Sequence, residues 1–389
     1  MAEKMTKVNL FGEEYSLVGK SSGGGGAGMG VTTSNRWLRF NFDDPNHKSL
    51  RILGGTSFLI GNDLVEFEED FIADFSSYIS EEGCDYYVFL NKDKNIICGT
   101  LRDVPEGYIF IGQFHTLCAD VGDNVTAIIP VEPGASVGYE ITIQDYFKDS
   151  DLDFYNFYTK TATAVNDGIP YATITVPHPL TGFKAKDILP ESVWCLNFHP
   201  KCKNWDGMVW CNGSNICVDI YLSSGMGIHT KSEYGAVHTV SRGTFDSQND
   251  LRLIGKKFTT QENFVDYSMG SNQLTFIQGK IDHSTVGGHV DTVGRRMISF
   301  IGCEECCGYL WQRTSTSGAT DNAVYSTPDE RGLFGNVFDQ PLVLTVGVSV
   351  VNSQTHGYIP GSRHINVIPY SIWTTAQFGN RGCSELTIV

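Results

Sequence analysis

The sequence has 389 residues, enough for two or three domains, with a formal net charge of −16 and a pI of about 5.0. Because phosphate binding needs clustered Lys and Arg, an acidic chain without a basic run argues against a nucleic-acid partner. No apolar run is long enough to span a bilayer, so we expect no membrane insertion. The N-terminus lacks the apolar core of a secretion signal, and 11 cysteines are an odd number for a disulfide framework. We therefore expect reduced thiols in a chain folded in the cytoplasm.

Residues 1–30 are predicted to be an N-terminal tail with a glycine-rich linker. Lys20 is followed by the run SSGGGGAGMG, a composition typical of flexible linkers. A phosphate-binding loop is disfavoured, because no Gly-Lys-Ser/Thr sequence follows Gly30.

Residues 31–185 contain short runs of β-forming residues separated by turn residues, which predicts a β-sandwich or a small barrel. The expected strands lie within 37–42, 49–55, 85–93, 95–101, 108–114, 125–131 and 171–176. The segment 62–80 is predicted to be one helix or an acidic loop. Its carboxylates could suggest a metal or acid–base site, but a solvated acidic face is favoured. These carboxylates are Glu66, Glu68, Glu69, Asp70 and Asp74.

From residue 186 onward the chain is rich in aromatic residues and cysteines. The spacing of the first cysteines is too wide for a zinc ribbon, so zinc binding is disfavoured even with His199 nearby. These cysteines are Cys195, Cys202, Cys211 and Cys217. The later run CEECC contains a CxxC pair, Cys303 and Cys306, followed by Cys307, without a thioredoxin-like context. Buried structural thiols are favoured, and we expect no metal and no cofactor.

The window 345–380 has an unusual composition. At 19% charged residues, 36 residues should carry about seven charges, but the window carries one, Arg363. Thirteen positions are Val, Ile or Thr, mixed with aromatic and small polar residues. That mixture suits a contact surface, since aromatic side chains give large area and Ser and Asn give adaptable hydrogen bonds. The alternative is a core-strand region of an ordinary β domain.

The same window is dominated by residues whose codons end in a pyrimidine. Lys, Glu and Met are absent, while Gln354, Gln377 and Trp373 are exceptions. Random replacement of both adenines in an AAY codon yields such a set. The pattern is therefore typical of a cassette that a diversity-generating retroelement rewrites at adenines.

Three segments together carry a family resemblance. The segment 255–273, GKKFTTQENFVDYSMGSNQ, is similar to a helix of C-type lectin folds of the formylglycine-generating-enzyme type, and 306–315, CCGYLWQRTS, resembles their "GNVWEW" segment. The closing segment resembles their final "GSR … W … G-x-RG" pattern. Val348 and Val350 depart from the family's usual Gly and Trp, and Gln312 departs from its usual Glu. The chain as a whole resembles the family of phage tropism-determining variable proteins.

The resemblance implies a mainly β protein: an N-terminal β-sandwich or barrel-like region and an α+β C-type lectin-like domain. The expected boundaries are 1–30 for the tail and linker, 31–185 for an assembly or stalk domain, and 186–389 for the ligand-binding domain. The variable region would span about 345–380 within that last domain.

A diversified surface must not also hold the fold together, so the window should separate framework from display positions. The expected framework residues are Gly361, Ser362, Arg363, Trp373, Arg381 and Gly382. The two arginines are expected to donate to loop carbonyls, because a guanidinium offers five donors. The expected exposed, ligand-binding positions are Val348, Val350, Val351, Ser353, Thr355, His356, Tyr358, Ile359, His364, Ile365, Val367, Ile368, Tyr370, Ile372, Thr374 and Thr375.

As function, the resemblance implies a receptor-binding protein on a virion, in a tail fibre or another surface appendage. Its partners would be a host-cell surface receptor, protein or glycan, and virion proteins through the N-terminal region, in a homotrimer. A formylglycine-generating-type enzyme is disfavoured, because Cys383 stands alone after Cys307. A calcium-dependent lectin is disfavoured, because the window has no Asp or Glu. A structural virion protein without receptor binding stays open.

Overall fold

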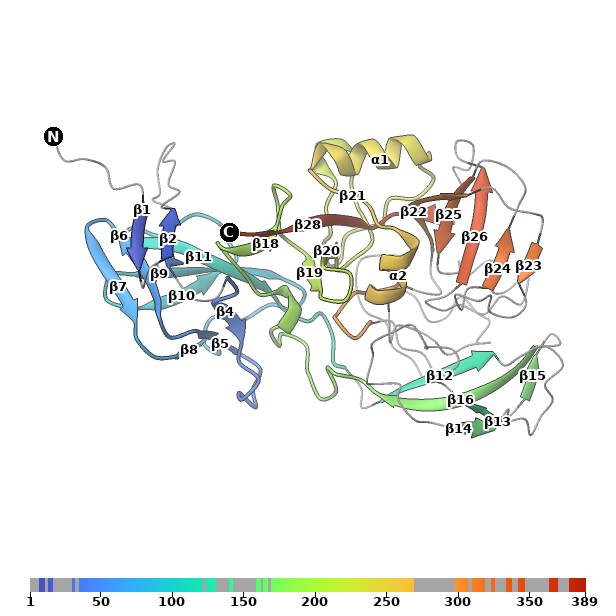
Figure 1. The fold of residues 1–389 in the computed structure, drawn as a ribbon, viewed down its shortest axis with the longest axis horizontal. Coiled ribbons are helices and arrows are strands. Elements are labelled where there is room, and N and C mark those ends of the chain that lie inside the picture. Colours follow the sequence, from blue (N-terminus) through green and yellow to red (C-terminus); the bar gives the residue numbers. More distant parts are fainter. Residues whose placement is uncertain are drawn as a thin grey trace. The chain divides into compact units, whose positions relative to one another are not determined.

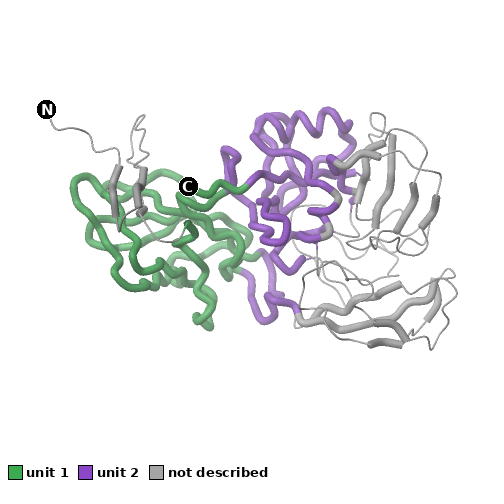
Figure 2. The backbone as a smooth tube through the Cα atoms, viewed as in Figure 1, with its two compact units in different colours: residues 1–117, 186–199, 386–389 green, residues 118–185, 200–385 purple. Residues whose placement is uncertain are grey.

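The structure, a computed structural model, describes residues 35–121, 178–268, 298–306, 310–315 and 378–389, and elsewhere only the backbone of the strands named below. Contacts divide the chain into two compact units (Figure 2), each made of separate stretches of sequence. Unit 1 comprises residues 1–117, 186–199 and 386–389, and unit 2 comprises residues 118–185 and 200–385. The division of the sequence into domains at residues 30 and 185 stays a prediction.

Unit 1 is built from short antiparallel strands (Figure 1) and one 3-10 turn, η3 (Pro190–Ser192). The strands are β1 (Lys7–Leu10), β2 (Glu13–Ser16), β3 (Gly30–Val31), β4 (Leu38–Phe40), β5 (Ser49–Ile52), β6 (Thr56–Ile60), β7 (Asp63–Phe67), β8 (Phe71–Asp74), β9 (Asp85–Asn91), β10 (Ile96–Gly99), β11 (Tyr108–His115), β17 (Trp194–Cys195) and β18 (Phe198–Pro200). Beside the β1-β2 hairpin, the sheet orders are β3-β6-β7, β4-β5-β8 and, within this unit, β10-β9-β11-β17-β18.

A two-residue alternation places one face of these strands in the core. In β7, Val65 and Phe67 are buried while the intervening Glu66 is exposed. Phe58 of β6 lies against Phe67, with ring centroids 6.1 Å apart, and Trp37 packs edge-on against Phe58 at 4.9 Å. Aromatic pairs of this geometry add to the free energy gained from burying their area.

The prediction of a helix or an acidic loop over 62–80 is wrong. This segment forms β7 and β8, because its apolar residues recur every second position and not at helical spacing. The five carboxylates named above and Asp63 are all exposed. One of them, Asp70, accepts a hydrogen bond from the backbone N–H of Gly54 at 2.9 Å and lies 3.3 Å from Arg51. The solvated acidic face is therefore confirmed.

In the part of unit 2 that the structure describes, the helices are α1 (Thr244–Leu253) and α2 (Gln261–Tyr267), with a 3-10 turn, η4 (Gly227–His229). Its strands are β12 (Asn124–Pro130), β13 (Glu140–Thr142), β14 (Thr159–Thr161), β15 (Ala164–Asn166), β16 (Ile169–Pro177), β19 (Met208–Cys211), β20 (Ile216–Asp219), β21 (Lys257–Phe258), β22 (Trp311–Gly318), β23 (Ala323–Tyr325), β24 (Phe334–Val337), β25 (Leu342–Val346), β26 (His364–Pro369), β27 (Phe378–Gly379) and β28 (Gly382–Ile388). The prediction of a mainly β chain is confirmed, and every expected strand segment overlaps a strand of the structure.

Two sheets of unit 2 matter for the site. In the first, β20 pairs with β19 on one side and β28 on the other, and β21 also pairs with β28. The second has the order β23-β24-β26-β25-β22-β27 (Figure 1). The helix that the resemblance implies within 255–273 is α2, which begins after Thr260, whose side chain accepts a hydrogen bond from Asn263 N. No helix within the described ranges is long and apolar enough to cross a membrane.

Candidate functional site

The 16 expected display positions fall mostly outside the described residues. Four of them, His364, Ile365, Val367 and Ile368, belong to the backbone of β26. This strand lies inside its sheet, parallel to β24 and antiparallel to β25. The other twelve, and the framework residues Gly361, Ser362, Arg363 and Trp373, lie outside the described residues.

Both ends of the window are paired to one strand, β22. At the first end, Val346 of β25 is opposite Gln312 of β22. At the second end, β27 runs parallel to β22, with Phe378 opposite Trp311 and Gly379 opposite Gln312. The two ends of the window therefore flank β22, while β26 from the middle of the window pairs with β24 and β25 of the same sheet.

Arg381, the first residue after the window, is completely buried. Its Nη1 donates to the carbonyl oxygens of Asp219 and Ile220 at 2.7 and 2.5 Å, and its Nη2 donates to the carbonyl of Glu304. Its Nε donates to Gln312 Oε1 at 3.1 Å. One guanidinium thus joins the end of β20, the CEECC segment and β22.

Gln312 extends this network. Its amide nitrogen donates to the carbonyl oxygens of Cys306 at 2.6 Å and Glu305 at 3.3 Å. The same amide accepts a hydrogen bond from Arg381, so it acts as both donor and acceptor. A carboxylate, which only accepts when ionised, could not fill both roles. This explains why Gln312 suits a position where the resembling family has Glu.

A buried ion pair lies beside the guanidinium. Lys256 Nζ is 2.5 Å from Asp219 Oδ1, and the backbone N–H of Gly382 donates to Asp219 Oδ2 at 3.0 Å. Burial raises the pKa of the Asp219 carboxyl, although Lys256 and Arg381 oppose that shift. Burial also disfavours charge on Lys256, but the Asp219 carboxylate outweighs it and raises the pKa of the ammonium. The carboxylate sits between two cations, as a buried charge requires.

Gly382 is needed for space at this ion pair. A Cβ there would lie 2.6 Å from Asp219 Oδ2, 2.9 Å from Lys256 Cδ and 3.0 Å from Leu251 Cδ2. All three atoms belong to packed, buried side chains. Any side chain at this position would push the carboxylate away from its partners.

Arg313 is a second buried arginine that the sequence did not single out. Its Nη2 donates to the carbonyl of Arg242 at 2.7 Å and its Nη1 to Asn380 Oδ1 at 3.3 Å. Its guanidinium also lies 5.2 Å from the centroid of the Phe378 ring. Burial lowers its pKa to about 10. In the sequence, the one feature that could have pointed to Arg313 was its place in the segment 306–315, which resembles the lectin-type family.

Two acidic residues of the CEECC run are buried. Glu304 Oε1 accepts from the thiol of Cys118 at 3.4 Å, and Glu305 Oε2 lies 3.1 Å from Nε2 of His238. Burial and the neighbouring Glu304 raise the pKa of Glu305 well above its ordinary value. Glu305 also has a backbone φ of 53°, a conformation that few residues other than glycine adopt.

The described cysteines are thiols, and all except Cys84 are buried. Burial raises the pKa of Cys211 to about 11 and that of Cys383 to about 12. A thiol that stays protonated near neutral pH is a poor nucleophile. Within the described ranges, no group of three or more His, Cys, Asp or Glu residues could hold a metal ion.

No protein-family model matches the sequence, and no curated protein matches it. Solved structures do match. The Major Tropism Determinant P3c variant superposes with a TM-score of 0.61 at 16% identity, covering 93% of this chain and 87% of that one. The I1 variant gives 0.61 at 17% identity with the same coverage, and the U1 variant gives 0.60 at 16%, covering 92% and 86%. The chain therefore has the fold of these variants, and the predicted resemblance is confirmed at the level of fold.

We predict that Arg381→Lys destabilises the protein by about 3–5 kcal/mol, because an ammonium cannot satisfy all of the buried oxygens that the guanidinium bonds. The matched control is Arg252→Lys on the exposed side of α1, which should change stability by no more than about 0.5 kcal/mol. Denaturant unfolding measures both. Equal stability of the two variants would contradict a structural role of Arg381.

We predict that Gly382→Ala costs about 1–3 kcal/mol, the usual range for overpacking a filled core. The control is Gly213→Ala, where the nearest atom to an added Cβ is 3.5 Å away, an ordinary contact distance. Thermal melts compare the two. A melting temperature of Gly382→Ala at or above that of the control would show that the pocket around Asp219 yields without strain.

Proposed function

We propose that this chain is a phage receptor-binding protein that determines tropism, with a diversified binding surface formed by 345–380 on a lectin-type fold. The main observation that supports this proposal is the fold shared with the Major Tropism Determinant variants over about nine-tenths of both chains. Those proteins are named as variants of a tropism determinant, and this chain has a window whose composition fits diversification.

The closure of the window on β22 supports this function. Val346 and Gly379, near the two ends of the window, are both opposite Gln312. Arg381, two residues after Gly379, donates mostly to backbone carbonyls. Backbone carbonyls are present whatever side chains a cassette encodes. Arg381 and its carbonyl partners lie outside the window, so these bonds use no side chain that a cassette would rewrite.

The alternative function is catalysis by an enzyme of the formylglycine-generating type, and we do not propose it. The enzyme alternative needs a pair of active-site cysteines near the C-terminus, whereas Cys383 stands alone after Cys307 and burial raises its pKa to about 12. A thiol that is protonated near neutral pH does not attack a substrate. We propose a binding protein, not an enzyme.

The proposed partners are a host-cell surface receptor, protein or glycan, and virion proteins contacted through the N-terminal region. The proposed location is a virion tail fibre or another surface appendage. A homotrimer would raise the apparent affinity of weak sites by roughly 10²–10⁴ through avidity. The mass from light scattering tests this oligomeric state, and a monomeric mass at micromolar concentration would exclude it.

We predict that Tyr358→Ser combined with Tyr370→Asn changes binding to host cells while stability shifts by no more than about 0.5 kcal/mol, as for surface positions. Trp373→Ala, at an expected framework position, should cost about 3–5 kcal/mol, as for a buried aromatic. Thermal melts and a cell-binding assay are run on the same preparations. A loss of several kcal/mol in the double tyrosine variant would mean that these residues belong to the core.

Diversification by a retroelement is tested in the DNA that surrounds the gene. We predict a near-copy of the segment encoding 345–380, differing from it at adenines of the copy, beside a reverse-transcriptase gene. Sequencing of the locus measures this directly. Without such a copy, the proposed receptor binding could hold, but the diversification would be wrong.

A further inference from the structure

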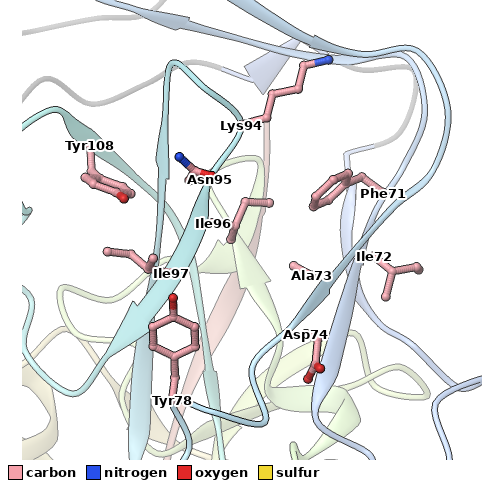
Figure 3. A pocket seen from close by; sticks show the side chains of 10 residues that line it. All are labelled: Phe71, Ile72, Ala73, Asp74, Tyr78, Lys94, Asn95, Ile96, Ile97 and Tyr108. Atoms are coloured by element: carbon pink, nitrogen blue, oxygen red, sulfur yellow. The ribbon is translucent and has the colours of Figure 1, made fainter.

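Unit 1 contains a groove of about 380 Å³ that no part of the proposed function uses. Figure 3 shows residues of β8 on one side and residues of β10 on the other, and Tyr78 and Tyr108 also line the groove. Among the strands that the structure describes, β8 pairs with β5 alone and β10 with β9 alone. The groove is therefore bordered by two sheet edges, and its volume falls within the range of small-ligand sites.

The side chains of the groove combine an aromatic surface with opposite charges. Tyr78 is 40% exposed, so much of its ring is available to a ligand. Asp74 supplies a carboxylate, Asn95 an amide and Lys94 an ammonium, and all three are exposed. Carboxylate oxygens accept, the ammonium donates and the amide does both. The two charges cancel, which selects against a strongly anionic or cationic ligand.

The Asp74 carboxylate and the backbone of the turn that carries Lys94 are positioned before any ligand arrives. Asp74 Oδ1 accepts from the backbone N–H and the hydroxyl of Ser76, at 2.8 and 2.6 Å. The turn that carries Lys94 is closed by Asn91, whose Oδ1 accepts from Asn95 N at 2.9 Å. Lys94 itself has a φ of 62°, and its ammonium lies 5.5 Å from the centroid of the Phe67 ring. Groups that are fixed in advance lose little entropy on binding.

An added peptide strand is the other ligand that two sheet edges could take. Strand addition gains its affinity from main-chain hydrogen bonds along an edge. Here β8 and β10 have four residues each, so each edge offers few outward-facing N–H and C=O groups. The polar side chains and the exposed tyrosine ring therefore favour a polyhydroxyl ligand over a peptide.

We propose that this groove binds a neutral saccharide. The apolar face of a sugar ring stacks on Tyr78, while Asp74 accepts from its hydroxyl groups and Lys94 and Asn95 donate to its oxygens. The site lies on unit 1, whereas the window 345–380 belongs to unit 2. It gives the protein a second binding site whose side chains do not change when the window is rewritten.

The test titrates the purified full chain with glucose, galactose, mannose and N-acetylglucosamine, by saturation-transfer NMR and calorimetry. We expect at least one of them to bind with a millimolar dissociation constant, and Tyr78→Ala and Asp74→Asn each to weaken that binding about tenfold. The matched control Tyr234→Ala removes a tyrosine of similar exposure, 38%, from unit 2 and should bind as the unchanged protein does.

Three outcomes would overturn the proposal. The first is that none of the four sugars binds at concentrations up to about 100 mM, well above the millimolar dissociation constant expected for a weak site. The second is that binding survives Tyr78→Ala, Asp74→Asn and Lys94→Gln, each with an unchanged melting temperature. The third is that an alternating Thr-Val peptide binds the groove while the sugars do not, which would assign the groove to strand addition. The double tyrosine variant of the window should keep sugar binding, which separates this site from the proposed receptor surface.

Discussion

The buried guanidinium of Arg381 is the constraint on which unit 2 depends. A buried charge is costly unless it is paired and fully hydrogen-bonded. Arg381 meets this requirement with three carbonyl oxygens, one amide oxygen and the nearby Asp219 carboxylate. The segments that supply these oxygens are far apart in sequence, at 219–220, 304 and 312. They must therefore all be in place for the charge to be tolerated, which makes the arrangement cooperative.

The same network bears on the proposal that 345–380 forms a changeable surface on a fixed fold. The window begins and ends opposite Gln312, and Arg381 bonds to that same residue. The backbone pairing and the Arg381 bonds use no window side chain, whereas Arg313 contacts two of them, Asn380 and Phe378. A fold shared with other proteins at 16–17% identity fits this logic, since backbone groups persist while side chains drift.

The sequence predicted the strands well, because residues such as Val65 and Phe67 alternate with exposed neighbours. It failed over 62–80, where a dense run of carboxylates resembled a helix surface and hid the two-residue period of β7 and β8. Arg381 and Gly382 could be named from a motif, but their partners could not, because Asp219 and Lys256 are separated from them by more than 120 residues. The groove of unit 1 could not be foreseen at all. Phe71 to Tyr78 and Lys94 to Tyr108 become neighbours only when two separate sheets form.

The two proposed binding sites would bind their ligands through different interactions. In the window, Val, Ile, Thr and Tyr supply apolar area, so affinity there depends on shape and can be regained after a change of sequence. In the groove, Ser76 holds the Asp74 carboxylate and Asn91 holds the backbone of the turn that carries Lys94, so its selectivity depends on positions that must not move. A site of the first kind tolerates diversification, whereas one of the second kind is lost by it. Placing them on different units lets one surface change while the other keeps a constant, weak affinity.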